Sequence, residues 1–332
     1  MKILFVGLGS MAHRHIKNIK MLYPVTQVSV WRQSCRDKEI GEIRNCIEKI
    51  FFEKEEVLHW NPDVVFLTNP APFHVEIALM FARMGSHLFI EKPMSTSLEG
   101  VDLLLQECKE RQLTIMVGYV LRFLKPLNII KQVLLEGHIG KVLFIRSAVG
   151  QYLCDWRPSV DYRKTVSAQK KLGGGALFEL SHELDYMRWL VGEIQAVNAI
   201  TSKASDLDLD VEDTTEILLK FRCGALGSVH LDMIDRAKNR SCRVIGTQGT
   251  LKWDVEDDHR VKLYLAEKKE WVELYSDPKM DSNEIYLEEL RHFFRCIERG
   301  TEPFITGEEG KRVLNLILAA KQSAQEKREI FL

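Results

Sequence analysis

Apolar residues along the first 120 positions come in short, nearly continuous runs separated by helix-like segments. In those segments, of which residues 73–85 are an example, apolar side chains recur at three- and four-residue spacing, and this predicts amphipathic helices. Strands that are apolar throughout are buried on both faces, and helices between them indicate a parallel sheet. The predicted strands are KILFV (2–6), QVSVW (27–31), DVVFLT (63–68), HLFI (87–90) and TIMVGYV (114–120).

After residue 121 the pattern changes. Residues 121–137 and 176–192 have helical spacing, an extended run at 143–153 lies between them, and residues 154–172 are polar and irregular. Short apolar runs without intervening helices follow, and they predict a meandering antiparallel sheet. These runs span 214–221, 226–234, 241–247, 249–255, 261–266 and 270–276, and two helices at about 283–299 and 307–327 follow them.

Chain length and these patterns together predict two domains, because 332 residues exceed what one core comfortably supports. The fold class that we expect is α/β. Residues 1–121 should form a Rossmann domain with a doubly wound parallel sheet. Residues 122–332 should form an α+β domain with a large, mostly antiparallel open sheet.

Composition and charge argue against several classes of protein. Hydrophobic residues make up 45% and charged residues 28% of the chain, and the net charge of −1 gives no reason to expect nucleic acid or a membrane surface as a partner. No run approaches 18 uncharged apolar residues, so we expect a soluble, cytoplasmic protein. The seven scattered cysteines contain no CxxC pair, and His13 and His15 face different directions on a helix, so no metal site is predicted.

The segment VGLGSMAHRH directly follows the first strand and opens a helix, as a dinucleotide-binding loop does. Glycine at the first position permits the tight turn, glycine at the second lets the backbone approach a pyrophosphate, and a small third residue lets helix and strand pack closely. The alternative is a purely structural glycine turn. The residues expected to line the cofactor here are Gly7, Gly9, Ser10, Met11 and Ala12.

The end of the second strand, VSVWRQS, favours NADP(H) over NAD(H). An NAD site usually has Asp or Glu about 20 residues after the loop, to bind the ribose 2′-hydroxyl. This chain has Trp31, Arg32 and Ser34 there and no acid. An arginine and a hydroxyl suit a 2′-phosphate, and Arg32 can also stack on adenine. The alternative is that Arg32 simply faces solvent. In that case it does not select a cofactor, and NAD(H) is possible.

The run HLFI ends in Glu91, Lys92 and Pro93. Open α/β sheets present ligands at the carboxyl ends of their strands, and this strand ends at the same edge as the glycine loop. We therefore expect Glu91 and Lys92 near the nicotinamide end of a bound cofactor. The alternative is a salt-bridged strand end without a function.

Five motifs in order resemble the Gfo/Idh/MocA family, which is named after glucose–fructose oxidoreductase and inositol dehydrogenase. They are GLGSMAHRH, TNPAPFH, EKP, VLRFLKPL…EGHIG and GGGALFELSHELD, and they span residues 1 to about 190. The resemblance implies that Lys92 contacts both the substrate hydroxyl and the cofactor ribose, that Glu91 holds the nicotinamide ribose, and that His182 is catalytic with Asp185 beside it. The remaining implied cofactor residues are Thr68, Asn69, Pro70 and His74.

The chain departs from the family pattern four residues before His182, where the best-known members have an aspartate and this chain has Phe178. A carboxylate occurs three residues before the histidine instead, at Glu179. On a continuous helix Glu179, His182 and Asp185 would share one broad face, so Glu179 is a candidate to orient His182. The alternative is a solvated glutamate.

The polar stretch before the GGG sequence is a candidate substrate contact. An irregular insert of about 20 residues in a compact domain is usually functional or disordered. Aromatic rings beside cations suit a sugar with an anionic group, whereas an ordinary surface loop or an oligomer contact would explain them equally well. The candidates are Trp156, Arg157, Tyr162 and Arg163, and the resemblance adds Tyr119 and Arg122.

Together these features predict an NADP(H)-dependent oxidoreductase acting on a secondary hydroxyl or keto group of a sugar, cyclitol or sugar derivative. Histidine suits a base with a pKa near the operating pH, and a lysine ammonium stabilises a developing alkoxide, so Lys92 and His182 form the expected catalytic pair. The alternatives are an NAD-dependent glycosidase of the same fold and a non-enzymatic dinucleotide sensor, which would be expected to lack one of these two residues. The resemblance also implies a homodimer or homotetramer formed through the C-terminal sheet.

Overall fold

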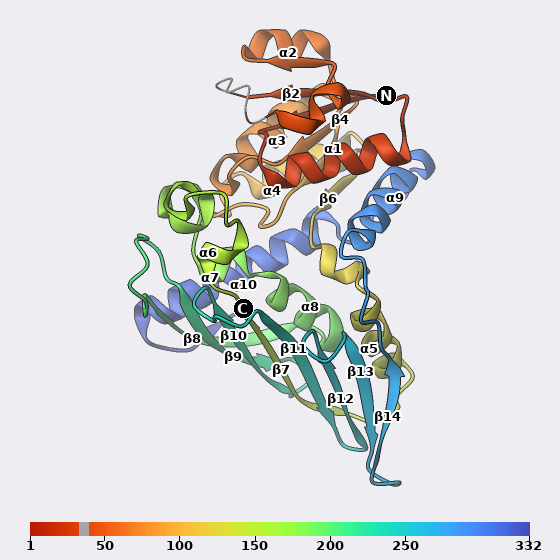
Figure 1. Cartoon of the computed structure of the whole chain (residues 1–332), viewed down its shortest axis with the longest axis vertical. Coiled ribbons are helices and arrows are strands. Elements are labelled where there is room, and N and C mark those ends of the chain that lie inside the picture. Colours follow the sequence, from red (N-terminus) through yellow and green to blue (C-terminus); the bar gives the residue numbers. More distant parts are fainter. Residues whose placement is uncertain (33–39) are drawn as a thin grey trace. The chain divides into compact units, whose positions relative to one another are not determined.

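The computed structural model describes residues 1–32 and 40–332, and these form two compact units. The first unit contains Met1–Val120 and Ser282–Leu314, and the second contains Leu121–Asp281 and Asn315–Leu332 (Figure 1). The division therefore differs from a single boundary near residue 121, because a segment far along the chain belongs to the first unit. No helix in the described part of the chain is long and apolar enough to cross a membrane.

The first unit is built on a six-stranded parallel sheet with the strand order β3-β2-β1-β4-β5-β6. This is the order of a Rossmann fold, and it confirms the predicted doubly wound sheet. Only the three-residue β3 was not anticipated. The strands are β1 (Lys2–Val6), β2 (Gln27–Trp31), β3 (Lys49–Phe51), β4 (Val64–Leu67), β5 (His87–Ile90) and β6 (Ile115–Val117).

The returning helix α9 (Glu284–Arg299) completes the core of this unit. The rings of Phe66 and Phe89, on neighbouring strands, stack at 4.8 Å between centroids, and Phe293 of α9 meets Phe89 edge-on at 5.4 Å. Figure 1 shows α9 beside α1 (Ser10–Leu22), where the amides of Asn18 and Asn283 exchange two hydrogen bonds. The other helices are α2 (Lys54–Trp60), α3 (His74–Met84) and α4 (Val101–Glu110), with short 3₁₀ turns η2 (Gly41–Cys46) and η3 (Ala71–Phe73).

The second unit contains a nine-stranded sheet with the order β14-β13-β12-β11-β7-β10-β9-β8-β15. All neighbours are antiparallel except β7 and β10, which confirms a mostly antiparallel sheet. The insertion of β7 between β10 and β11 interrupts the predicted meander. The strands are β7 (Val142–Gly150), β8 (Ile194–Ser202), β9 (Thr214–Phe221), β10 (Leu226–Asp232), β11 (Asn239–Gly246), β12 (Gly249–Asp254), β13 (Arg260–Leu265), β14 (Glu270–Tyr275) and β15 (Ile330–Phe331).

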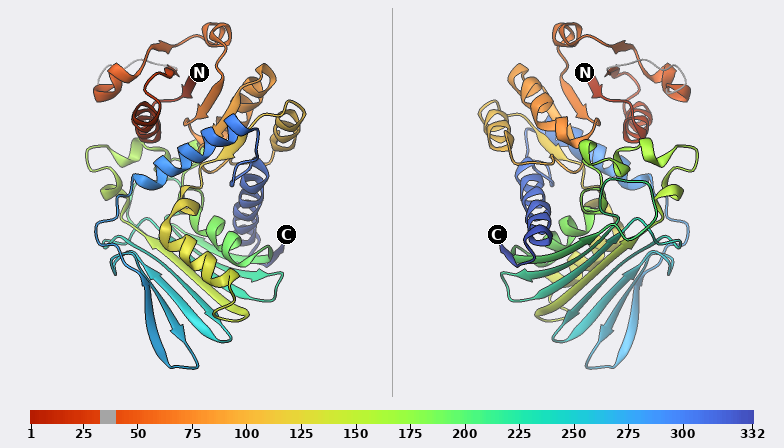
Figure 2. Two further views of the ribbon diagram at one scale, coloured as in Figure 1. Left: turned by 90° about the vertical axis from the view of Figure 1, so that its right-hand side faces the viewer. Right: turned by 90° about the vertical axis from the view of Figure 1, so that its left-hand side faces the viewer.

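Helices cover one face of this sheet (Figure 2). Helix α5 (Lys125–Leu135) lies against β12 and β13, and α8 (His182–Val191) lies against β7. The continuous helix predicted for residues 176–192 was wrong, because α7 (Ala176–Glu179) ends before α8 begins and the backbone turns at Leu180 and Ser181. The remaining elements are η4 (Val120–Phe123), α6 (Leu153–Trp156), η5 (Tyr162–Lys164), η6 (Val166–Ala168), η7 (Lys170–Leu172) and α10 (Gly307–Glu326).

Candidate functional site

The glycine loop forms an open cradle at the start of α1. Gly7 has φ of 86°, and a Cβ atom on it would lie 3.1 Å from the backbone of Asn69, so the turn requires glycine. A Cβ on Gly9 would meet no described atom within 4 Å, and no described side chain caps the first turn of α1. Ser10 and Met11 lie in that turn, and Ala12 is fully buried. Open backbone amides at a helix N-terminus fit a pyrophosphate.

The turn after β4 is fixed to the turn after β5 by His74. Its Nε2 lies 2.7 Å from the carbonyl oxygen of Asn69, and its Nδ1 lies 3.2 Å from that of Pro93. Burial lowers the pKa of His74, so the neutral ring has one N–H, which we place on the nearer contact to Asn69. The Thr68 hydroxyl donates to the carbonyl of Val6 at 2.9 Å. These bonds hold three predicted cofactor residues at one edge of the sheet.

Asn69 also offers a ligand an acceptor. Its side-chain Oδ1 is buried and has no hydrogen-bond partner among the described residues. Buried polar atoms are normally satisfied, so an acceptor of this kind beside the glycine loop fits a bound group that carries hydroxyls or an amide. The following residue, Pro70, precedes the short η3 turn.

The EKP sequence forms a turn at the end of β5 that is tied to α1. Glu91 is 8% exposed, and its Oε1 lies 2.7 Å from Nε2 of the fully buried His15. The other carboxylate oxygen of Glu91 accepts a hydrogen bond from the backbone N–H of Lys92 at 3.3 Å, and the following Lys92–Pro93 peptide bond is cis. The carboxylate therefore fixes the backbone from which the Lys92 side chain projects.

A second buried acid, which the sequence patterns did not single out, lies in the same unit. Glu289 of α9 is 1% exposed, and burial together with the nearby charge of Glu91 raises its pKa well above the usual range. Its carboxyl group therefore retains its proton to higher pH than an exposed glutamate does. The only sequence signal is its position on α9 next to Leu290 and four residues before Phe293, which places a glutamate on an apolar face.

The residues at the end of β2 are partly described. The ring of Trp31 packs edge-on against Phe81 at 6.2 Å between centroids, and the backbone N–H of Arg32 donates to the carbonyl of Phe51 at 3.1 Å. Both side chains are half-buried, which leaves part of each accessible. Ser34, the other predicted residue here, lies outside the described residues.

In the second unit, His182 is the first residue of α8, and Asp185 lies one turn further along. Asp185 is fully buried and pairs with Arg122, whose Nη2 lies 2.7 Å from its Oδ1. Glu179 ends the separate helix α7 and accepts a hydrogen bond from the hydroxyl of Ser167 at 2.9 Å. Glu179 is thus linked to the polar stretch and does not lie on one helix with His182.

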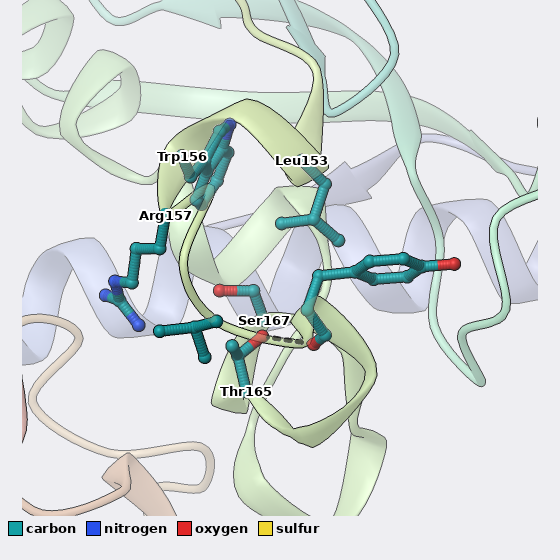
Figure 3. A pocket seen from close by; sticks show the side chains of 7 residues that line it. Leu153, Trp156, Arg157, Thr165 and Ser167 are labelled. Atoms are coloured by element: carbon teal, nitrogen blue, oxygen red, sulfur yellow. Dashed lines mark hydrogen bonds between the residues drawn. The ribbon is translucent and has the colours of Figure 1, made fainter.

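Three of the four candidates in the polar stretch line one small cavity, together with Leu153 and Thr165 (Figure 3). The cavity has a volume of about 10 Å³, which is room for a single water molecule. The side chain of Arg157 points away from Leu153. The hydroxyl oxygen of Tyr162 accepts a hydrogen bond from the backbone N–H of Asp208 at 3.0 Å. Trp156 is the third of these candidates.

The other three candidate substrate contacts are placed differently, and one of them, Arg122, is paired with Asp185 as described above. The guanidinium of Arg163 is exposed and pairs with Asp161 at 2.8 Å. Tyr119, in the first unit, is fully buried. Among the described residues, no group of three or more His, Cys, Asp or Glu side chains could hold a metal ion.

Comparison with protein families matches both parts of the chain. Residues 1–119 match "Oxidoreductase family, NAD-binding Rossmann fold", and residues 131–332 match "Oxidoreductase family, C-terminal alpha/beta domain". The chain belongs to the Gfo/Idh/MocA oxidoreductase family. This membership confirms the family, the oxidoreductase class and an NAD-binding fold in the first unit.

Named dehydrogenases resemble this chain in sequence over most or all of its length, and in fold. Myo-inositol 2-dehydrogenase of Thermotoga maritima is 29% identical over 348 residues, which cover 99% of this chain and 98% of that protein. Levoglucosan dehydrogenase of Pseudarthrobacter phenanthrenivorans is 28% identical over 234 residues, which cover 62% of this chain and 59% of that protein. A structure of levoglucosan dehydrogenase in complex with NADH has a TM-score of 0.86 at 22% identity and covers 100% of this chain and 98% of that one, which shows the same fold.

Proposed function

We propose that this family member transfers hydride between a nicotinamide dinucleotide and a secondary hydroxyl or keto carbon of a sugar, cyclitol or sugar derivative. The observation that carries the proposal is the EKP turn. Its Lys92 directly follows Glu91, whose Oε1 lies 2.7 Å from Nε2 of His15 on α1, the helix that begins at the glycine cradle. The names of the relatives, which are inositol and levoglucosan dehydrogenases, support this substrate class.

The chain supplies a charge-stabilising group and a base for this reaction. A nicotinamide held by the glycine cradle would supply the hydride acceptor in the oxidative direction. The ammonium group of Lys92 hydrogen-bonds to the substrate oxygen and stabilises its developing negative charge. His182 takes the hydroxyl proton at Nε2, because its Nδ1 is buried. The C–H bond thus loses hydride, the O–H bond loses a proton to His182, and a ketone remains.

The glycine cradle, Asn69, Glu91 and Arg32 are the residues that would hold the dinucleotide. We favour NADP(H), because the described residues after β2 begin with an arginine at the place where an acid would bind the 2′-hydroxyl of NAD. NAD(H) is the alternative, and the bound NADH of a structural relative belongs to that protein alone.

The polar stretch is the proposed contact for the distal part of the substrate. Arg157, Trp156 and Tyr162 combine a cation with two rings around one hollow, as an anionic sugar derivative would require. Because the hollow has room for about one water molecule, the substrate would contact its rim and not fill it.

Self-association through the open sheet is the proposed assembly. One face of the nine-stranded sheet is not covered by helices (Figure 2). Large apolar side chains are exposed on four of its strands, and a second copy would bury them. Leu218→Asp should convert the protein to monomer in size-exclusion chromatography with light scattering, whereas Leu135→Asp, an exposed leucine on α5, should not. These sheet residues are Ile200, Leu218, Leu226 and Trp271.

Turnover assays of Lys92→Ala and His182→Ala test the function. The wild-type protein would be screened with inositols, anhydrosugars and sugar acids while NAD(P)H formation is followed at 340 nm (about 5.4 kcal/mol of transition-state stabilisation is at stake for a 10⁴-fold effect). Each variant should lose turnover about 10²- to 10⁴-fold and keep dinucleotide binding. Glycoside cleavage without net NAD(P)H formation would identify a glycosidase, and binding without any turnover would identify a sensor.

A further inference from the structure

Helix α8 begins at His182, and its first turn is held by a buried ion pair. The guanidinium of Arg122 donates from Nε to both carboxylate oxygens of Asp185, at 3.2 and 3.0 Å, and from Nη2 to Oδ1 at 2.7 Å. Arg122 is 2% exposed and Asp185 is fully buried. Neither side chain can therefore form a broad contact with a substrate while the pair is intact.

The far end of α8 is held by a second cation. The ammonium group of Lys131, on α5, donates to the carbonyl of Trp189 at 2.7 Å and lies 5.8 Å from the Trp189 ring centroid. Arg122 lies 6.0 Å from the same ring. Burial, followed by the charge of Arg122, lowers the pKa of Lys131. Helix α8 is therefore fixed at both ends by side chains from the segment Val120–Leu135.

The backbone of Arg122 is itself fixed. The side-chain amide of Asn128 donates to the carbonyl of Arg122 and to that of Leu124, both at 2.9 Å. The guanidinium therefore projects from a rigid turn onto a rigid helix. A two-pronged arginine–carboxylate contact between such elements specifies orientation as well as distance.

Stability alone is a poor reason to retain this pair. Removing two charges from water costs much of what their attraction returns, and replacing a buried ion pair by well-packed apolar residues is often neutral or stabilising. Breaking the pair by removing one partner is different, because it leaves one buried charge uncompensated. The two kinds of change therefore separate stability from geometry.

We propose that Arg122 and Asp185 form a positioning pair that sets the orientation of His182 at the start of α8. Asp185 lies three residues after His182 on the same helix, so a tilt or rotation of the first turn moves the imidazole directly. The proposal rests on the proposed function only for the consequence in turnover, because the orientation of His182 can be measured without a substrate.

The test compares broken and replaced pairs. Arg122→Met and Asp185→Asn each break the pair and should each lower both Tm and kcat. The double replacement Arg122→Met/Asp185→Leu should recover the wild-type Tm, while its kcat stays about 10- to 100-fold below wild type. Its dinucleotide affinity should be unchanged. A double variant with wild-type kcat would overturn the proposal. Should the double variant fail to fold, Arg122→Lys keeps the charge but loses the fork, and the same loss of kcat is expected.

A matched control lies on the same helix. Arg188 pairs with Glu193 through Nη2 and Oε1 at 2.9 Å at the far end of α8. Replacing both, as Arg188→Met/Glu193→Leu, removes a two-pronged ion pair without touching the first turn. This control should keep kcat within about twofold of wild type, and a loss equal to that of the Arg122/Asp185 variant would show a general effect of helix stability and contradict the proposal.

The second readout is the imidazole of His182 itself. The chain has ten histidines, and ¹³C-histidine labelling with His182→Gln would identify its signal. In the Arg122→Met/Asp185→Leu variant this signal should shift while those of the other histidines stay in place. An unchanged His182 signal would overturn the positioning role. A wild-type protein without turnover would contradict only the proposed function, and the shift would still decide the role of the pair.

Discussion

Nε2 of His15 on α1 lies 2.7 Å from Oε1 of Glu91 at the end of β5, in surroundings made largely of aromatic rings. The ring of His15 packs against Phe89 at 5.2 Å, Phe66 at 5.7 Å and Tyr286 at 6.2 Å between centroids. This one contact joins the helix that begins at the glycine cradle to the turn that carries Lys92. The glycine cradle and the proposed catalytic lysine are therefore joined by one buried contact.

Loss of His15 should disturb both stability and binding. His15→Ala leaves the buried Glu91 without its partner, which costs about 3 kcal/mol of unfolding free energy. We also expect several-fold weaker dinucleotide binding, because the EKP turn is no longer tied to α1. Urea unfolding and fluorescence titration measure the two effects. His13→Ala, on the same helix and half-exposed, is the control, and equal losses in both variants would contradict this role.

Glu289 should make the protein less stable as pH rises. Its pKa in the folded protein is raised by burial and by Glu91, so above the ordinary carboxyl pKa the unfolded chain releases a proton that the folded protein retains. Stability is thus lost as pH rises towards the folded pKa. Glu289→Gln removes this dependence.

We expect the free energy of unfolding of Glu289→Gln, measured in urea, to rise relative to that of the wild type between pH 4.5 and pH 8. Glu288→Gln, a partly exposed neighbour that pairs with Arg291, is the control and should show no such trend. A gap that stays constant over this range would mean that Glu289 is ionised in the folded protein.

His230 should have the opposite pH dependence. On the outer face of the sheet its Nε2 lies 2.9 Å from Asp232 and its Nδ1 2.6 Å from Glu216, and the hydrogen bond to Asp232, with that to Glu216 in support, raises the pKa of His230 to about 9. A raised pKa contributes stability that is complete below the unfolded value near 6.5 and is lost as pH rises through about 9.

His230→Gln should therefore destabilise the protein at pH 6 and have little effect at pH 10. Because the side chain is 37% exposed, solvent screening limits the difference to about 1 kcal/mol. Thermal unfolding at the two pH values measures it. His138→Gln is the control, because His138 is exposed and pairs with Glu136. If His230→Gln lost the same unfolding free energy at pH 6 and at pH 10, the proposed pH linkage of His230 would be refuted.

Local patterns were enough to predict the glycine turn and most strands, because a buried strand or a glycine turn is specified by adjacent residues. Strand β8 (Ile194–Ser202) was missed, since its small alanines weaken the alternation of apolar and polar residues. The insertion of β7 between β10 and β11 could not be read from spacing, because strand pairing depends on residues far apart in the sequence.

The candidate site shows the same division. The sequence indicated Lys92 and His182 individually, but it could not show that Arg122 pairs with Asp185, 63 residues away. The return of α9 to the first unit, which buries Glu289, was equally invisible, because an amphipathic helix does not say which core it joins. The break between α7 and α8 also removed the single helical face on which Glu179 had been expected to support His182.

Arg32 should decide the choice of dinucleotide. Its backbone N–H is fixed to Phe51 at 3.1 Å, and its side chain begins at the end of β2, where the ribose-binding residue of a Rossmann fold lies. A guanidinium there favours a 2′-phosphate by charge-assisted hydrogen bonds, each of which contributes about 1.5 to 3 kcal/mol. We therefore expect tighter binding of NADPH than of NADH, by about tenfold or more.

Titration of the purified protein with each reduced dinucleotide, followed by nicotinamide fluorescence and tryptophan quenching, measures this preference. Arg32→Asp should weaken NADPH binding and strengthen NADH binding, since a carboxylate repels the 2′-phosphate and accepts from the 2′-hydroxyl. Arg44→Asp, in the η2 turn of the same unit, controls for the change in net charge. Equal affinity of the wild type for both dinucleotides would contradict the role of Arg32 and leave NAD(H) as the cofactor, because the cradle at Gly7 and Gly9 serves either one.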